Sequence, residues 1–95
     1  MNKFVVICTD KDRRGVFGGI LVSHNQETKV AVLEQAQMCV KWTSDIGGVV
    51  GLAAKGPSEH CRISAPAPRI ELDGVSCVMD ASDEAKAKWE KQPWG

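Results

Sequence analysis

The side chains in this chain that are suited to chemistry favour binding over reaction. They include cations that can contact phosphate, a hydroxyl, backbone amides beside glycine, and an indole that can stack on a base. The candidate ligand-binding residues are Arg14, Trp42, Ser44, Gly47, Gly48, Lys55 and Arg62. Because these residues occupy separate segments, they form one site only if the fold brings the segments together.

Each candidate also has a structural interpretation. Trp42 can belong to the core, Arg14 can be a solvated turn residue, and Ser44 can cap a helix. Glycines at 47 and 48 indicate that something approaches the backbone closely, which can be the neighbouring sheet, a second subunit or a ligand. The sequence leaves these alternatives open.

Patterns typical of enzymes are missing from the sequence. It contains no Gly-x-Ser-x-Gly, no His-Glu-x-x-His and no phosphate-binding loop, because Lys55 precedes Gly56 and no hydroxyl residue follows at the required place. His60 and Cys61 are adjacent, so on a strand they would point to opposite faces and could not act as a nucleophile and its base. We expect a protein without catalytic activity and without a cofactor.

The four cysteines indicate thiols rather than disulfides. Cys8, Cys39, Cys61 and Cys77 form no Cys-x-x-Cys pair, and a reducing compartment keeps such residues reduced. Free cysteines are commonly buried, so we expect small core residues. A zinc site with His24 and His60 would require scattered residues to converge, and we expect no metal.

Length and charge indicate one domain, residues 1–95, with a balanced surface. The chain has 95 residues, with 12 basic and 12 acidic side chains and a net charge of zero. It therefore has neither a polybasic tail nor the charge of a DNA mimic, and nucleic-acid binding would need a local patch. A chain this short buries only roughly 60–65% of its unfolded surface, so we expect a homo-oligomer.

The apolar segments are too short to cross a membrane. The longest candidate, residues 46–54, contains three glycines and falls well below the roughly 20 residues that a span requires. The N-terminal run, residues 3–9, is followed at once by a charged turn, which indicates a strand and not a signal peptide. We therefore expect no membrane association and a cytoplasmic protein.

The first half of the chain is predicted to be β-structure. Residues 3–9 are apolar and β-branched, residues 15–23 and 28–34 form a hairpin, and residues 38–42 form a strand that ends at Trp42. Gly18 and Gly19 predict a bulge or bend where the strand curls or another backbone approaches.

The second half contains the predicted helices. Residues 43–45 can cap a short helix that ends at residues 55–57. The glycines in this segment disfavour a helix, so one isolated turn or a glycine-rich loop is nearly as well supported by the sequence. Residues 65–68 form a proline-rich connector, and residues 69–72 and 75–79 are strands joined by a hairpin turn or a bulge.

The final helix begins after Ser82 and stops at Pro93, and Trp89 should anchor it to the sheet. The predicted fold class is α+β and mostly β. It is a strongly bent antiparallel sheet or a small SH3/Sm-like barrel, with a short helical turn after Trp42 and a C-terminal helix.

Several motifs resemble a widespread family of small proteins from tailed phages and prophages. In order along the chain they are Arg-Gly-Val-Phe-Gly-Gly from residue 14, Met-Cys-Val-Lys-Trp-Thr-Ser from residue 38, Gly-Val-Val-Gly-Leu-Ala-Ala-Lys-Gly-Pro from residue 48, Cys61-Arg62, and Pro93-Trp94. The resemblance spans nearly the whole chain and implies a phage source. Lys41 departs from the aromatic residue expected before the tryptophan.

By looser analogy, small β-rich phage proteins are similar in size and oligomeric habit to sponges that sequester cyclic nucleotide signals of bacterial immunity. The first hypothesis is therefore a homo-oligomeric anti-defence protein that holds such a signal without cleaving it. Arg14, Lys55 and Arg62 would contact phosphates, Trp42 would stack on the base, and Ser44 with the glycine amides would complete the site.

Two alternatives come from other classes of protein. A protein-interaction module could inhibit a host or phage protein through a sheet edge and the glycine-rich surface. A weak single-strand nucleic-acid binder would show a steep salt dependence, but the zero net charge disfavours it.

Overall fold

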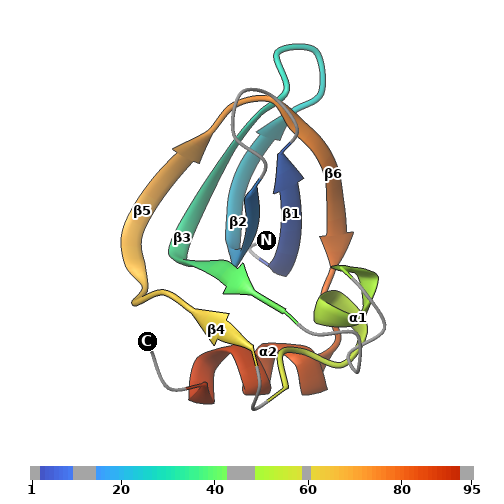
Figure 1. Ribbon diagram of the computed structural model, residues 1–95. Helices are drawn as coiled ribbons and strands as arrows, with labels where there is room; N and C mark the ends of the chain where they lie inside the picture. Colours follow the sequence, from blue (N-terminus) through green and yellow to red (C-terminus); the bar gives the residue numbers. More distant parts are fainter. Residues whose placement is uncertain (1–2, 10–14, 43–48, 59–60, 93–95) are drawn as a thin grey trace.

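The computed structural model describes residues 3–9, 15–42, 49–58 and 61–92 (Figure 1). Its elements, in order, are β1 (Phe4–Thr9), β2 (Gly15–Asn25), β3 (Val30–Lys41), α1 (Val49–Ala54), β4 (Arg62–Ile63), β5 (Ala67–Leu72), β6 (Val75–Asp80) and α2 (Asp83–Lys91). The predicted α+β class, mostly β with two helices, is confirmed. None of the described helices is both long and apolar enough to cross a membrane.

All strand pairs are antiparallel, and the sheet is bent but open. One edge of β3 pairs with β2, while its other edge pairs first with β5 and then with β4. On the far side, β1 pairs with both β2 and β6, so β5 and β6 lie at opposite ends of the sheet. Of the two predicted architectures, the structure has the bent open sheet.

Asp73 and Gly74 form a corner between the two outer strands. The chain passes over one end of the sheet from β5 to β6 (Figure 1), so these residues do not form a two-strand hairpin. Gly74 has φ +65°, a conformation that glycine adopts without steric cost. The Val75 N–H then donates to the Lys29 carbonyl at 3.0 Å and ties the corner to the start of β3.

The bend in the sheet lies at the predicted glycine pair. The register between β2 and β3 shifts between Gly18 and Ile20, which confirms the predicted bulge. A Cβ atom on Gly19 would lie 3.1 Å from both the Ala36 Cα and the Glu34 carbonyl oxygen. The close backbone approach predicted for this glycine is therefore also confirmed.

The third strand is longer than predicted. It continues through Gln35 and Gln37, polar residues that lie between the two strands predicted for residues 28–34 and 38–42. Gln35 has φ +52°, and buried Gln37 donates its side-chain amide to the Ser64 carbonyl at 3.1 Å. The polar stretch thus bends one strand instead of ending it, because the Ser64 carbonyl, just after β4, accepts the hydrogen bond from the buried Gln37 amide.

Two hydrophobic clusters lie on the two faces of the sheet, because successive residues of β1 point to opposite sides. The cluster on the helix face contains Phe4, Val6, Val16, Cys39, Leu52, Ala53, Cys61, Ile63, Ala85 and Trp89. The cluster inside the bend contains Val5, Ile7, Ala31, Leu33, Ala36, Leu72 and Val75. The sheet is therefore buried on both faces in its middle.

The C-terminal helix is anchored as predicted. Trp89 is fully buried, and its indole N–H donates to the Leu52 carbonyl of α1 at 3.0 Å. The Ser82 hydroxyl caps α2 by accepting from the Ala85 N–H at 3.0 Å and also donates to the Ala54 carbonyl at 2.7 Å. Both helices are thus joined to one another and to the sheet. The predicted cap at residues 43–45 and the predicted stop at Pro93 lie outside the described residues.

Candidate functional site

Trp42 lies directly after β3 and is 38% exposed, so it is not a core residue. Its side chain lines a groove of about 450 Å³ where the end of β1, the start of β2 and the end of β3 meet. The groove is lined by Cys8, Thr9, Gly15, Val16, Met38, Cys39, Val40 and Trp42. This lining is mostly apolar and contains one aromatic ring, which suits a flat apolar group such as a base.

An exposed apolar row leads along β3 into the groove. Met38 and Val40 are 37% and 61% exposed, and with Trp42 they occupy alternate positions, which share one face of a strand. Large apolar side chains gathered at one place on a surface are typical of a binding site. The strand predicted for residues 38–42 implies this shared face, but the exposure of the row could not be predicted from the sequence.

A glycine shapes the wall of the groove beside Trp42. The Gly15 N–H donates to the Thr9 hydroxyl at 3.0 Å, which holds the start of β2 against the end of β1. A Cβ atom on Gly15 would lie 2.5 Å from a ring carbon of Phe17, so a larger residue would displace that ring.

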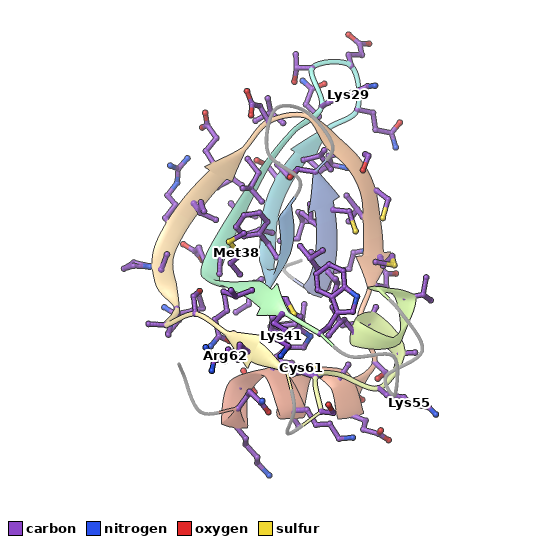
Figure 2. The ribbon with its side chains drawn as sticks, in the orientation of Figure 1. Lys29, Met38, Lys41, Lys55, Cys61 and Arg62 are labelled. Atoms are coloured by element: carbon purple, nitrogen blue, oxygen red, sulfur yellow. The ribbon has the colours of Figure 1, made fainter. Side chains whose placement is uncertain are left out.

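Two cations face each other next to the groove. Arg62 of β4 is the cross-strand partner of Lys41, and both side chains are exposed (Figure 2). Within the described part of the chain, no recorded ion pair includes either side chain. Like charges directly opposite on a sheet repel each other. An anion bound between Lys41 and Arg62 would reduce this repulsion.

Lys41 and Trp42 are consecutive residues, so the cation pair and the indole flank the end of β3 from two sides. Of the predicted site residues, Trp42 and Arg62 thus lie near the same end of β3, and Lys41, Met38 and Val40 lie there as well. Pairing of Lys41 with Arg62 could not be recognised before the register of β3 and β4 was known.

The remaining predicted site residues have different positions. Lys55 is exposed just after α1, and Figure 2 shows it well apart from Arg62 on β4. Arg14, Ser44, Gly47 and Gly48 lie outside the described residues. Arg14 directly precedes Gly15, a residue of the groove wall, and residues 43–48 directly follow Trp42.

The thiols near the groove are held in their protonated form. Burial, with a smaller contribution from the nearby Cys61, raises the pKa of Cys39 to about 12, and the bond from the Cys39 thiol to the Lys41 carbonyl opposes this shift. Burial also raises the pKa of Cys8 to about 11, together with a hydrogen bond to Cys77 and the charge of Cys77. Both thiols are therefore almost entirely protonated near neutral pH.

All four cysteines are free thiols, as predicted, but only Cys39 and Cys61 are buried. Cys8 is half-buried and Cys77 is exposed, so the expectation of four core residues is wrong for Cys77. Within the described ranges, no group of three or more metal-ligating side chains converges. His60, part of the weighed zinc alternative, lies outside them.

A second hollow, of about 600 Å³, lies between β6 and the hairpin that joins β2 to β3. Its rim includes His24, Gln26 and Lys29, the last of which is labelled in Figure 2. The residues that line it include no Phe, Tyr or Trp side chain, and Lys3 at its edge is paired with Asp80 at 2.8 Å. The groove at Trp42 is therefore the better candidate for a ligand with a base.

Comparison with known proteins identifies a family but no function. A family model described as "Domain of unknown function (DUF6948)" matches residues 2–89. No curated protein and no solved structure matches the chain.

Proposed function

The chain belongs to the DUF6948 family, and we propose that it is a binding protein that holds a nucleotide-like anion without transforming it. One observation carries the proposal: Lys41 and Arg62 face each other with no acidic partner in the described ranges, beside the exposed indole of Trp42. The arrangement offers positive charge and an aromatic surface at one end of the sheet.

The cation pair supports an anionic ligand on energetic grounds. A like-charged cross-strand pair destabilises the free protein slightly relative to a neutral pair. A phosphate placed between Lys41 and Arg62 would remove this repulsion, and the arginine fork can bind two phosphate oxygens at once. Because both side chains are exposed, a phosphate can reach them without any rearrangement of the sheet.

The groove supports a base as the second part of the ligand. Its volume of about 450 Å³ falls in the range of small-molecule sites, roughly 300–1,000 Å³. Stacking of a base on an aromatic side chain contributes about 1–3 kcal/mol. Trp42 supplies the ring, and Met38 supplies apolar contact beside it.

The biological role that we attach to this site comes from the sequence resemblance. In this proposal a homo-oligomer from a phage sequesters a cyclic nucleotide signal of host defence. Arg14, Ser44, Gly47 and Gly48, which adjoin Gly15 and Trp42 along the chain, would complete the contacts to phosphate. Lys55 is not part of this proposed site, because it lies away from Arg62 (Figure 2).

The exposed apolar row supports a second candidate, a protein-interaction module. Val40 is 61% exposed, the highest exposure in the row, and a single base would not need all three side chains. A partner protein could instead cover Met38, Val40 and Trp42 together. This candidate predicts that the row matters for binding and that the cation pair matters little.

Titration calorimetry with cyclic dinucleotides and cyclic ADP-ribose isomers tests the first candidate. We expect one of these nucleotides to bind, and Trp42→Ala and Arg62→Ala each to weaken its binding at least tenfold. Arg69→Ala is the matched control. Arg69 is an exposed arginine on β5, which pairs with the same edge of β3 as β4 does, but it has an acidic neighbour, Glu71, at 3.9 Å. Equal losses in Arg62→Ala and Arg69→Ala would show that only general charge is involved, and the site assignment would be wrong.

A further inference from the structure

The four thiols form two pairs that differ in access. Cys8 on β1 and Cys77 on β6 are directly opposite in the antiparallel ladder, whereas Cys39 and Cys61 pack in the core cluster on the helix face. Cys77 is exposed and Cys8 is half-buried, while the other two are buried. A reagent in solution can therefore reach the first pair and not the second.

The backbone positions of Cys8 and Cys77 suit a disulfide. The Ala81 N–H donates to the Phe4 carbonyl at 3.1 Å, and hydrogen-bonded pairs recur at every second position of an antiparallel ladder. Cys8 and Cys77 therefore occupy a hydrogen-bonded pair, and Cα atoms in such pairs are typically about 5.5 Å apart. This separation is within the range of about 4.4–6.8 Å that disulfides span.

Cys77 lies close enough to Cys8 to influence its thiol. After burial, the next largest cause of the raised pKa of Cys8 is a hydrogen bond with the Cys77 thiol. The pair also lies beside a β-bulge, because the register between β1 and β6 shifts between Cys8 and Thr9. There the Ser76 hydroxyl donates to the Cys8 carbonyl at 3.2 Å, which keeps β6 close to β1 at this point.

We propose that Cys8 and Cys77 form an oxidation site, in which a peroxide closes a disulfide between β1 and β6. The thiolate of exposed Cys77 attacks one peroxide oxygen, the O–O bond breaks, and Cys77 becomes a sulfenic acid as the other oxygen leaves and is protonated to water. The Cys8 sulfur then attacks the Cys77 sulfur, the S–O bond breaks, and the departing hydroxide takes the Cys8 proton as a second water. Two thiols are oxidised and one peroxide is reduced.

The cross-link would fasten the outer strand β6 to β1, whose end contributes to the wall of the groove. Cys8 lines the groove at Trp42, and β6 forms one end of the sheet. The bond would enclose most of the chain in one loop, which constrains the unfolded state strongly. We expect the melting temperature to rise by roughly 10 °C on oxidation. This inference does not depend on which ligand the groove binds.

The test treats the reduced protein with a small excess of hydrogen peroxide and then counts free thiols by alkylation and mass spectrometry. We expect the intact mass to fall by two hydrogens, the alkylated thiols to drop from four to two, and peptide mapping to join Cys8 to Cys77. Reduction with dithiothreitol should restore all four thiols and the original melting temperature.

Two variants make the result specific. Cys77→Ser removes the exposed partner and should keep all three remaining thiols, whereas Cys39→Ala should still form the cross-link. The proposal is overturned if peroxide leaves every thiol of the wild-type protein unreacted, or if Cys77 is oxidised to a sulfinic acid or joined to a second chain while Cys8 stays free. A cross-link that maps to Cys39 and Cys61 would overturn it equally.

Discussion

The indole ring of Trp89 lies on Gly18 of β2, so close that a Cβ atom at Gly18 would be 2.9 Å from two of the ring carbons. The helix α2 can approach the sheet this closely only because residue 18 has no side chain. The same ring contacts Phe4 of β1, with ring centroids 6.2 Å apart. One glycine and one tryptophan thus set the distance between the helical layer and the sheet.

We expect Gly18→Ala to destabilise the protein by about 1–3 kcal/mol, because the added methyl group collides with a fully buried indole that has no room to move. Alanine also restricts the unfolded chain, which alone would stabilise by about 0.4–1 kcal/mol, so the sign of the change reports the collision. Urea denaturation measures it. Val22→Ala, at an exposed site on the same strand, should stay within about 0.5 kcal/mol of wild type.

We expect Ser82→Ala to lower the free energy of unfolding by about 1–2 kcal/mol. The substitution removes both the cap on the Ala85 N–H and the bond to the Ala54 carbonyl of α1. Ser82→Thr keeps the hydroxyl and is the matched control. Denaturation curves in which both variants lose equal stability would show that the hydroxyl is not what joins the two helices.

The stability of the reduced protein should fall above about pH 9, for a reason specific to its thiols. Folding raises the pKa of Cys39 from 9.0 to about 12 and that of Cys8 from 9.0 to about 11. Below pH 9.0 the folded and the unfolded protein both keep these thiol protons, so the thiols do not reduce the free energy of unfolding. Above it the unfolded chain loses protons that the folded protein retains, so the free energy of unfolding decreases until the folded pKa is passed.

Unfolding measured between about pH 8 and about pH 11 in a phosphine reductant tests this. Cys39→Ala should start from a lower stability because the substitution leaves a cavity. Its free energy of unfolding should fall less steeply with pH, because unfolding then releases up to one proton fewer. A slope identical to that of wild type would show that Cys39 does not carry the effect.

We expect Lys41→Glu to stabilise the free protein slightly, by about 0.2–1 kcal/mol, because it replaces a like-charged cross-strand pair by an opposite-charged one. The same change should abolish binding of the nucleotide. Arg69→Glu is the control with the opposite expected sign. Arg69 lies opposite Glu34, so this charge reversal creates a like-charged pair and should destabilise the protein. Both effects should shrink in 1 M salt. Loss of stability in Lys41→Glu would remove the electrostatic argument for an anion site.

Most of the fold could be predicted because its signals are local. Alternation in residues 3–9, the glycine pair at 18 and 19, and the cap at Ser82 each depend on near neighbours in sequence. The continuity of β3 could not be predicted, because the partner of buried Gln37 is Ser64, far away along the chain. A polar stretch reads as a turn unless the group that satisfies it is known.

The candidate site could be predicted only in part, for the same reason. Trp42 was left open between core and surface, since burial depends on which element covers a side chain and not on its own neighbours. Arg62 was selected for its charge alone, while its pairing with Lys41 required the register of two strands. Lys55 was grouped with Arg62 from sequence order, but α1 carries it away from β4.

Native mass spectrometry with the panel of cyclic dinucleotides and cyclic ADP-ribose isomers tests the central claim most directly, because it reports subunit number and bound mass together. The account predicts an oligomer that takes up one nucleotide at fixed stoichiometry, releases it chemically intact on heating, and loses it in Lys41→Glu. A protein that binds no member of the panel, or releases a cleaved product, would contradict the proposal that this groove and its cation pair hold a nucleotide unchanged.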